Sequence, residues 1–110
     1  MTRFAAEMDW YGADGSVETK VPCFVDLSSP SIRVAYDIEG IGYSYSGQDQ
    51  GFEHYKLTYN NGPGNATLHR FIRTDDRGAT EVSQVLEGHW VEGGLRGMWR
   101  VQLIREVRKS

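Results

Sequence analysis

The chain has 110 residues, of which 39% are hydrophobic and 25% are charged, and its formal net charge is −3. This length suits one domain with a modest core, and this composition is that of a globular rather than a disordered protein. The small negative charge gives no electrostatic reason to expect a nucleic acid or an anionic membrane as a partner. We therefore expect a single domain over residues 1–110.

Cysteine usage and the N-terminal segment bear on the cellular compartment. Cys23 is the single cysteine, so an internal disulfide is excluded and nothing points to an oxidising compartment. The segment Met1–Trp10 carries Arg3, Glu7 and Asp9, unlike the apolar core of a signal peptide. No apolar run approaches the length of a membrane span. These features predict a cytoplasmic protein.

Segments rich in Val, Ile, Thr, Tyr, Phe and Trp alternate along the chain with clusters of turn residues, a pattern typical of β-strands. The predicted strands, in chain order, are Phe4–Tyr11, Val17–Leu27, Ile32–Tyr45, Phe52–Tyr59, Ala66–Thr74, Thr80–Glu92 and Leu95–Glu106. The 13 glycines favour tight turns, and no segment keeps a helical apolar period, so we expect no substantial helix.

The last two predicted strands can be paired residue by residue. The dipeptide Gly93-Gly94 favours a two-residue hairpin turn. Such a turn places Trp90 opposite Gly97 and Gly88 opposite Trp99, so that each indole lies over a glycine of the neighbouring strand. The match of large to small side chains indicates that these residues share the inward face.

Three earlier hairpins extend the same inward face. A three-residue loop at Asp76–Gly78 pairs Arg70 with Gln84. The turn before it pairs Tyr55 with Arg70, and the turn before that pairs Gly42 with Tyr55. A slip of one residue in any pair would turn the apolar side chains of that strand outward.

Consecutive strands with no covering helix leave closure as the simplest way to hide both sheet edges. We therefore predict an all-β fold, an antiparallel up-and-down meander of about seven strands closed into a small barrel. Gly40 and Gly42, in mid-strand, mark the sharp bend or bulge that closure needs. A two-sheet β-sandwich is the alternative. The strand order resembles an up-and-down calycin barrel, the architecture of lipocalins and avidins; this resemblance concerns architecture only and implies no function.

Inward aromatic and polar side chains are the candidate ligand-binding residues. They are Tyr36, Glu53, Tyr55, Tyr59, Arg70, Gln84, Trp90 and Trp99. Aromatic walls with a few polar groups suit a binding pocket, in which Arg70 would anchor an anion or carboxylate and Glu53 could neutralise it. The alternatives, which small barrels favour, are an interior filled by its own side chains and an Arg70 whose head reaches water at a barrel end.

Apolar side chains also point away from the predicted core, and they are Tyr43, Tyr45, Phe71, Val85, Val91, Met98 and Ile104. Five of them lie on the last three predicted strands and could adjoin: Phe71, Val85, Val91, Met98 and Ile104. An outward apolar patch usually marks an interface, so these residues predict a homodimer or another protein partner. The alternative is that the chain's own termini cover these strands.

No catalytic, metal or cofactor site is predicted. The three histidines His54, His69 and His89 fall on the outer face, without the three or four convergent ligands that zinc needs. No G-x-S-x-G segment occurs, and Cys23 is interpreted as a small buried hydrophobic residue.

The preferred hypothesis is a non-catalytic protein that holds a small apolar or aromatic molecule at one mouth of the barrel. A second hypothesis is a regulator, inhibitor or immunity-type factor that acts on a protein partner through its outer surface. A third is an isomerase or cyclase that uses the barrel as a chamber, with Tyr55, Arg70 and Glu53 as acid, electrostatic stabiliser and base.

Overall fold

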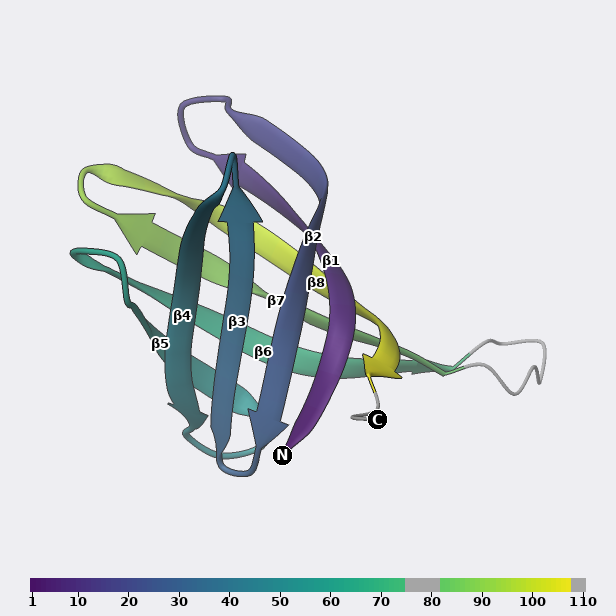
Figure 1. Ribbon diagram of the computed structural model, residues 1–110. Coiled ribbons are helices and arrows are strands. Elements are labelled where there is room, and N and C mark those ends of the chain that lie inside the picture. The colour runs from purple at the N-terminus through teal and green to yellow at the C-terminus, as the bar shows by residue number, and fades with distance from the viewer. Residues whose placement is uncertain (75–81, 108–110) are drawn as a thin grey trace.

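The computed structural model describes residues 1–74 and 82–107 and shows a closed barrel of antiparallel strands (Figure 1). The strands are β1 (Thr2–Gly12), β2 (Val17–Ser28), β3 (Ser31–Ile38), β4 (Ile41–Asp49), β5 (His54–Tyr59), β6 (Gly64–Thr74), β7 (Val82–Glu92) and β8 (Leu95–Val107). Each strand pairs with the next, and β8 pairs back with β1. The predicted antiparallel meander and its closure are confirmed. Within the described ranges, no helix is long and apolar enough to cross a membrane.

The hairpin of β7 and β8 has the predicted register, with Trp90 opposite Gly97 and Gly88 opposite Trp99. Both tryptophans are buried, and the indole Nε1 of Trp99 donates a hydrogen bond of 3.0 Å to the carbonyl oxygen of Thr67 on β6. A side-chain Cβ built on Gly97 would lie 2.8 Å from the ring of Trp90 and 1.9 Å from the carbonyl oxygen of Tyr11. Position 97 therefore requires glycine, because the indole of Trp90 and the backbone of β1 both lie close to it.

The predicted strand Ile32–Tyr45 is wrong, because it consists of two strands joined by a tight turn. Glu39 and Gly40 form this turn with φ angles of 53° and 82°, so Gly40 marks a reversal of the chain and not a bend in one strand. The extra reversal changes which side chains face inward. Tyr43 and Tyr45, predicted to point outward, lie on the inner face, and Tyr45 is only 1% exposed.

The predicted registers around β6 differ from the observed ones by two residues. Arg70 lies opposite Leu86 and not opposite Gln84, and Tyr55 lies opposite Leu68 and not opposite Arg70. Because side chains in a strand alternate with a period of two, a shift of two residues keeps the same side chains inward. The predicted inward face of these strands is therefore correct although the pairs are not.

The predicted pairing across the next turn is wrong in a different way. Asp49, and not Gly42, lies opposite Tyr55, because β4 runs on to Asp49 before the chain turns. The predicted loop at Asp76–Gly78 lies outside the described residues.

The middle of the barrel is filled by aliphatic side chains from facing strands. Those with no exposed surface are Val25, Val34, Leu68, Leu86 and Val101. The filled interior agrees with the sequence-based alternative for small barrels, and it leaves the ends of the barrel, and not its middle, as places for a ligand inside it.

We expect Gly97→Ala to lower the free energy of unfolding by about 1–3 kcal/mol, because the added methyl group meets backbone and an indole that cannot both move away. Gly94→Ala is the matched control on the same hairpin, since a Cβ there has no neighbour within 4 Å, and it should change stability by less than about 0.5 kcal/mol. Urea unfolding of both variants measures the difference. Equal stability of the two variants would contradict the close approach of Trp90 and β1 at Gly97.

Candidate functional site

A cavity of about 290 Å³ opens at the end of the barrel where the hairpins β1–β2, β3–β4, β5–β6 and β7–β8 turn. We call this cavity the aromatic mouth. It is lined by Met8, Trp10, Ser16, Tyr36, Ile38, Tyr43, Tyr45, Tyr59, Trp90, Glu92, Leu95 and Trp99. All three tryptophans of the chain are among these residues.

The rings of the aromatic mouth pack on one another from several strands. The ring centroids of Tyr45 and Tyr59 are 4.9 Å apart, and those of Tyr45 and Trp99 are 5.0 Å apart. Tyr36 stacks on Tyr43 at 5.5 Å. These distances are those of favourable aromatic pairs, so the wall is fixed by its own contacts before a ligand enters.

Glu92 brings a carboxylate into the aromatic mouth, where the phenol of Tyr45 donates a hydrogen bond of 2.6 Å to its Oε2. Among the described residues, Glu92 is the one charged side chain that lines this cavity. The sequence analysis missed it, although the signal was present: Glu92 lies two residues after Trp90 in the same strand and so shares its inward face.

The tyrosines around Glu92 are held in their neutral form. Burial is the main cause that raises the pKa of Tyr45, and the hydrogen bond and the charge of Glu92 add to it. Burial, followed by the charge of Glu92, likewise raises the pKa of Tyr36 and of Tyr59. These phenols therefore keep their protons near neutral pH, and that of Tyr45 donates to Glu92.

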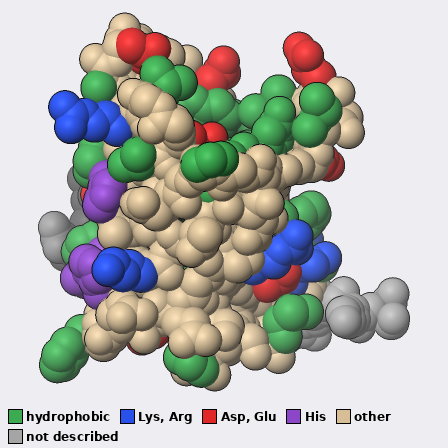
Figure 2. Space-filling view, turned by 90° about the vertical axis from the view of Figure 1, so that its left-hand side faces the viewer, with side chains coloured by type: hydrophobic (Ala, Val, Ile, Leu, Met, Phe, Trp, Pro, Cys, Tyr) green, Lys and Arg blue, Asp and Glu red, His purple; other side chains and the backbone are tan. Residues whose placement is uncertain are grey.

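The rim of the aromatic mouth carries exposed hydrophobic and acidic side chains. Ile38 and Leu95 line the cavity and are exposed, and Ile41 lies opposite Ile38, whereas Asp14 and Glu39 are exposed in the adjoining turns. Figure 2 shows hydrophobic and acidic side chains together along the upper part of the molecule, the level at which the tips of β1–β2 and β3–β4 lie in Figure 1. Exposed apolar surface around a cavity is typical of a ligand-binding opening.

A broad hollow of about 630 Å³ lies on the flank of the barrel and shares Tyr36 and Tyr43 with the aromatic mouth. It lies where β2 and β3 part, since their pairing runs only from Phe24–Ala35 to Ser28–Ser31. Beyond these pairs the β1–β2 hairpin leans away from β3 (Figure 1). The flank hollow and the aromatic mouth are therefore neighbours that share two tyrosine side chains.

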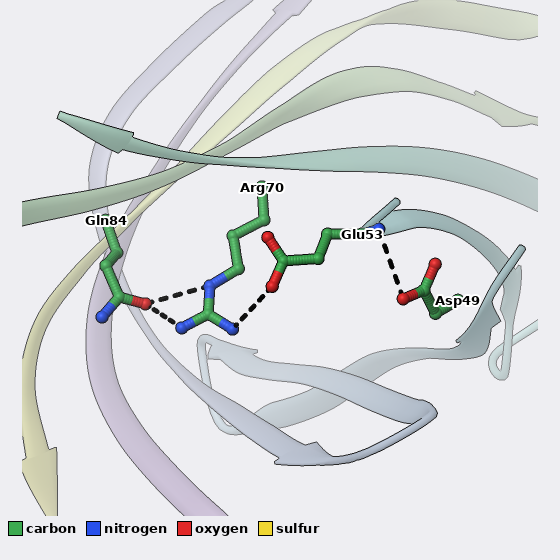
Figure 3. A network of polar contacts seen from close by, with 4 residues as sticks. All are labelled: Asp49, Glu53, Arg70 and Gln84. Atoms are coloured by element: carbon green, nitrogen blue, oxygen red, sulfur yellow. Dashed lines mark hydrogen bonds and ion pairs between the residues drawn. The ribbon is translucent and has the colours of Figure 1, made fainter. Parts of the chain in front are cut away.

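Arg70 lies in a polar network at the other end of the barrel (Figure 3). Its Nε donates a hydrogen bond of 3.0 Å to Oε1 of Gln84, its Nη2 donates to the same oxygen, and its Nη1 lies 3.5 Å from Oε1 of Glu53. The backbone N–H of Glu53 in turn donates to Asp49 Oδ2. The Arg70 side chain is only 19% exposed and its guanidinium is occupied by its own neighbours, so it is not an open anion anchor.

The predicted ligand-binding residues therefore divide between the two ends. Tyr36, Tyr59, Trp90 and Trp99 line the aromatic mouth, whereas Glu53, Tyr55, Arg70 and Gln84 belong to the opposite end. Along β6, the pair Arg70–Leu86 is four residues beyond the pair Ala66–Trp90, or roughly 13 Å at strand spacing. The structure does not bring the two sets together in one pocket.

The outward apolar residues differ in their exposure. Phe71, Met98 and Ile104 are about half exposed, and Val91 is half-buried. Val85 is only 2% exposed, so it is not available at the surface of the monomer. An interface through the other four residues stays a prediction.

The histidines and the cysteine lie outside the aromatic mouth. His54 and His69 face each other across β5 and β6 with their Nδ1 atoms 3.4 Å apart. Over the part of the chain that the structure describes, no group of three or more His, Cys, Asp or Glu side chains converges on a metal position. Cys23 is buried as predicted, and burial, followed by the charge of Glu7, raises the pKa of its thiol to about 12.

Comparisons with protein-family models, with curated proteins and with solved structures yield no match.

The raised pKa of Tyr45 predicts a pH dependence of stability. Its phenol ionises near pH 10 in the unfolded chain but stays neutral in the barrel, so the contribution of Tyr45 to stability is constant below about pH 10 and falls above it. Tyr45→Phe should cost about 1.5–3 kcal/mol at pH 8, because a hydrogen bond to a carboxylate is lost. The difference in the free energy of unfolding between wild type and variant should shrink by about 1.4 kcal/mol at pH 11. The wild type loses this stability because Tyr45 ionises in its unfolded chain, and the variant has no phenol at this position to ionise. Urea unfolding at both pH values measures this difference, and a deficit independent of pH would contradict the buried neutral phenol.

Proposed function

We propose that the protein is a calycin-like, cytoplasmic barrel that binds a small apolar or aromatic molecule in the aromatic mouth. The observation that carries this proposal is a cavity of about 290 Å³ whose wall is built mainly from tryptophan and tyrosine rings. This volume is at the lower end of the range of small-molecule sites, and an apolar aromatic wall with a few polar groups is their usual lining.

The packing of the rest of the barrel supports the mouth as the place of binding. The middle of the interior is filled by aliphatic side chains without exposed surface, and the opposite end is occupied by the Arg70 network. The rings of the wall are already packed on one another, so binding would order few side chains and would lose little conformational entropy.

Fluorescence offers a direct test, because every tryptophan of the chain lines the aromatic mouth. We expect the neutral probe N-phenylnaphthylamine to bind and to accept excitation energy from the tryptophans. Trp10→Ala removes a half-buried part of the wall and should weaken binding by about fivefold or more, the effect of losing about 1 kcal/mol.

The matched control is Phe71→Ala, which removes an exposed aromatic ring from the outer face and should leave the affinity unchanged. Absence of energy transfer, or equal affinity of the Trp10→Ala variant and the wild type, would contradict binding in the aromatic mouth.

A further inference from the structure

We infer that the ligand of the aromatic mouth is an organic cation, an alkyl- or arylammonium ion, for which Glu92 is the counter-ion. This inference rests on the proposed function and adds the chemical class of the ligand. It is carried by one juxtaposition: a single carboxylate enclosed by aromatic rings, with no cationic side chain among the described residues that line the cavity.

Aromatic rings and a carboxylate favour the same kind of ligand. The faces of tryptophan and tyrosine rings carry negative electrostatic potential and attract ammonium groups, and cages of such rings are a known way to bind quaternary ammonium ions. The cavity offers rings from β1, β3, β4, β5, β7 and β8 around Glu92. A ligand with an ammonium head and an apolar body satisfies both parts of this wall.

The carboxylate has hydrogen-bonding capacity to spare for a ligand. Tyr45 donates to Oε2 of Glu92, whereas an ionised carboxylate can accept about four hydrogen bonds. The bond from Tyr45 fixes the orientation of the carboxylate without neutralising its charge. Glu92 is half-buried and is the last residue of β7, so an ammonium group can reach it from the opening.

The Arg70 network offers a comparison, because there the charged group has partners within the chain. At that end the guanidinium has both a carboxylate partner, Glu53, and an amide partner, Gln84. At the aromatic mouth Glu92 accepts a hydrogen bond from a phenol, which leaves its negative charge in place, and no cationic side chain is among the described residues that line the cavity. A neutral ligand would not use this charge, and an anionic ligand would be repelled by it.

Three compounds that share one phenylbutyl body test the inference: phenylbutylamine, phenylbutanol and phenylbutanoate, titrated against tryptophan fluorescence. We expect the amine to bind at least tenfold more tightly than the alcohol, which corresponds to about 1.4 kcal/mol, and the acid to bind most weakly. This ranking uses the wild-type protein and therefore does not depend on the folding of any variant.

Glu92→Gln should lower the affinity for the amine about tenfold and change the affinity for the alcohol by less than about twofold. Glu87→Gln, which removes the same charge from the outer face beside Arg100, is the matched control and should change neither. If the alcohol or the acid binds as tightly as the amine, the cation specificity is overturned while the binding site stands. If none of the three binds, and the neutral naphthyl probe does not bind either, the proposed function itself fails.

Discussion

The barrel depends on two indole rings that lie over glycines of the neighbouring strand. Trp90 covers Gly97 and Trp99 lies opposite Gly88, and in both places a Cβ would fall within 2 Å of a backbone carbonyl of the adjoining strand. The missing side chains let β6, β7, β8 and β1 approach closely, and Trp99 uses this approach to donate to the Thr67 carbonyl. This hairpin fixes which of its side chains face inward. Pairing and the alternation of side chains then determine the inward side chains of each neighbouring strand in turn.

The same packing makes the interior uneven along its axis. Aliphatic side chains fill the middle, and the large rings gather toward one end, where they enclose space instead of filling it. The two ends then differ in charge. At one end Arg70 has its own carboxylate, Glu53, whereas at the other Glu92 has a phenol and no cation among the residues that line the cavity. The alternating strands therefore place the Arg70 network at one end and an open, negatively charged cavity at the other.

Local turn chemistry explains how far the sequence predicted this arrangement. Gly93-Gly94 is a strong two-residue turn signal, and the hairpin built on it was predicted residue for residue. The turn at Glu39-Gly40 was missed because glutamate rarely adopts the positive φ that it has here. Without this turn, the sequence analysis predicted seven strands instead of eight and placed Tyr45 on the outer face. Glu92 could have been found from its alternation with Trp90, but a charged residue beside a turn is ordinarily a solvent-exposed one.

The position of Glu92 is a compromise between the cost of burying a charge and the strength of its interactions. In the filled middle of the barrel an unpaired carboxylate would be strongly destabilising, whereas in bulk water its attraction for a cation at 4 Å would be only about 1 kcal/mol. At a half-buried place the same attraction approaches about 4 kcal/mol, and the phenol of Tyr45 offsets part of the desolvation. Because Tyr45 is itself buried against Trp99 and Tyr59, the carboxylate is oriented by the core packing. The contacts that stabilise the mouth are therefore also the ones that would select the charge of its ligand.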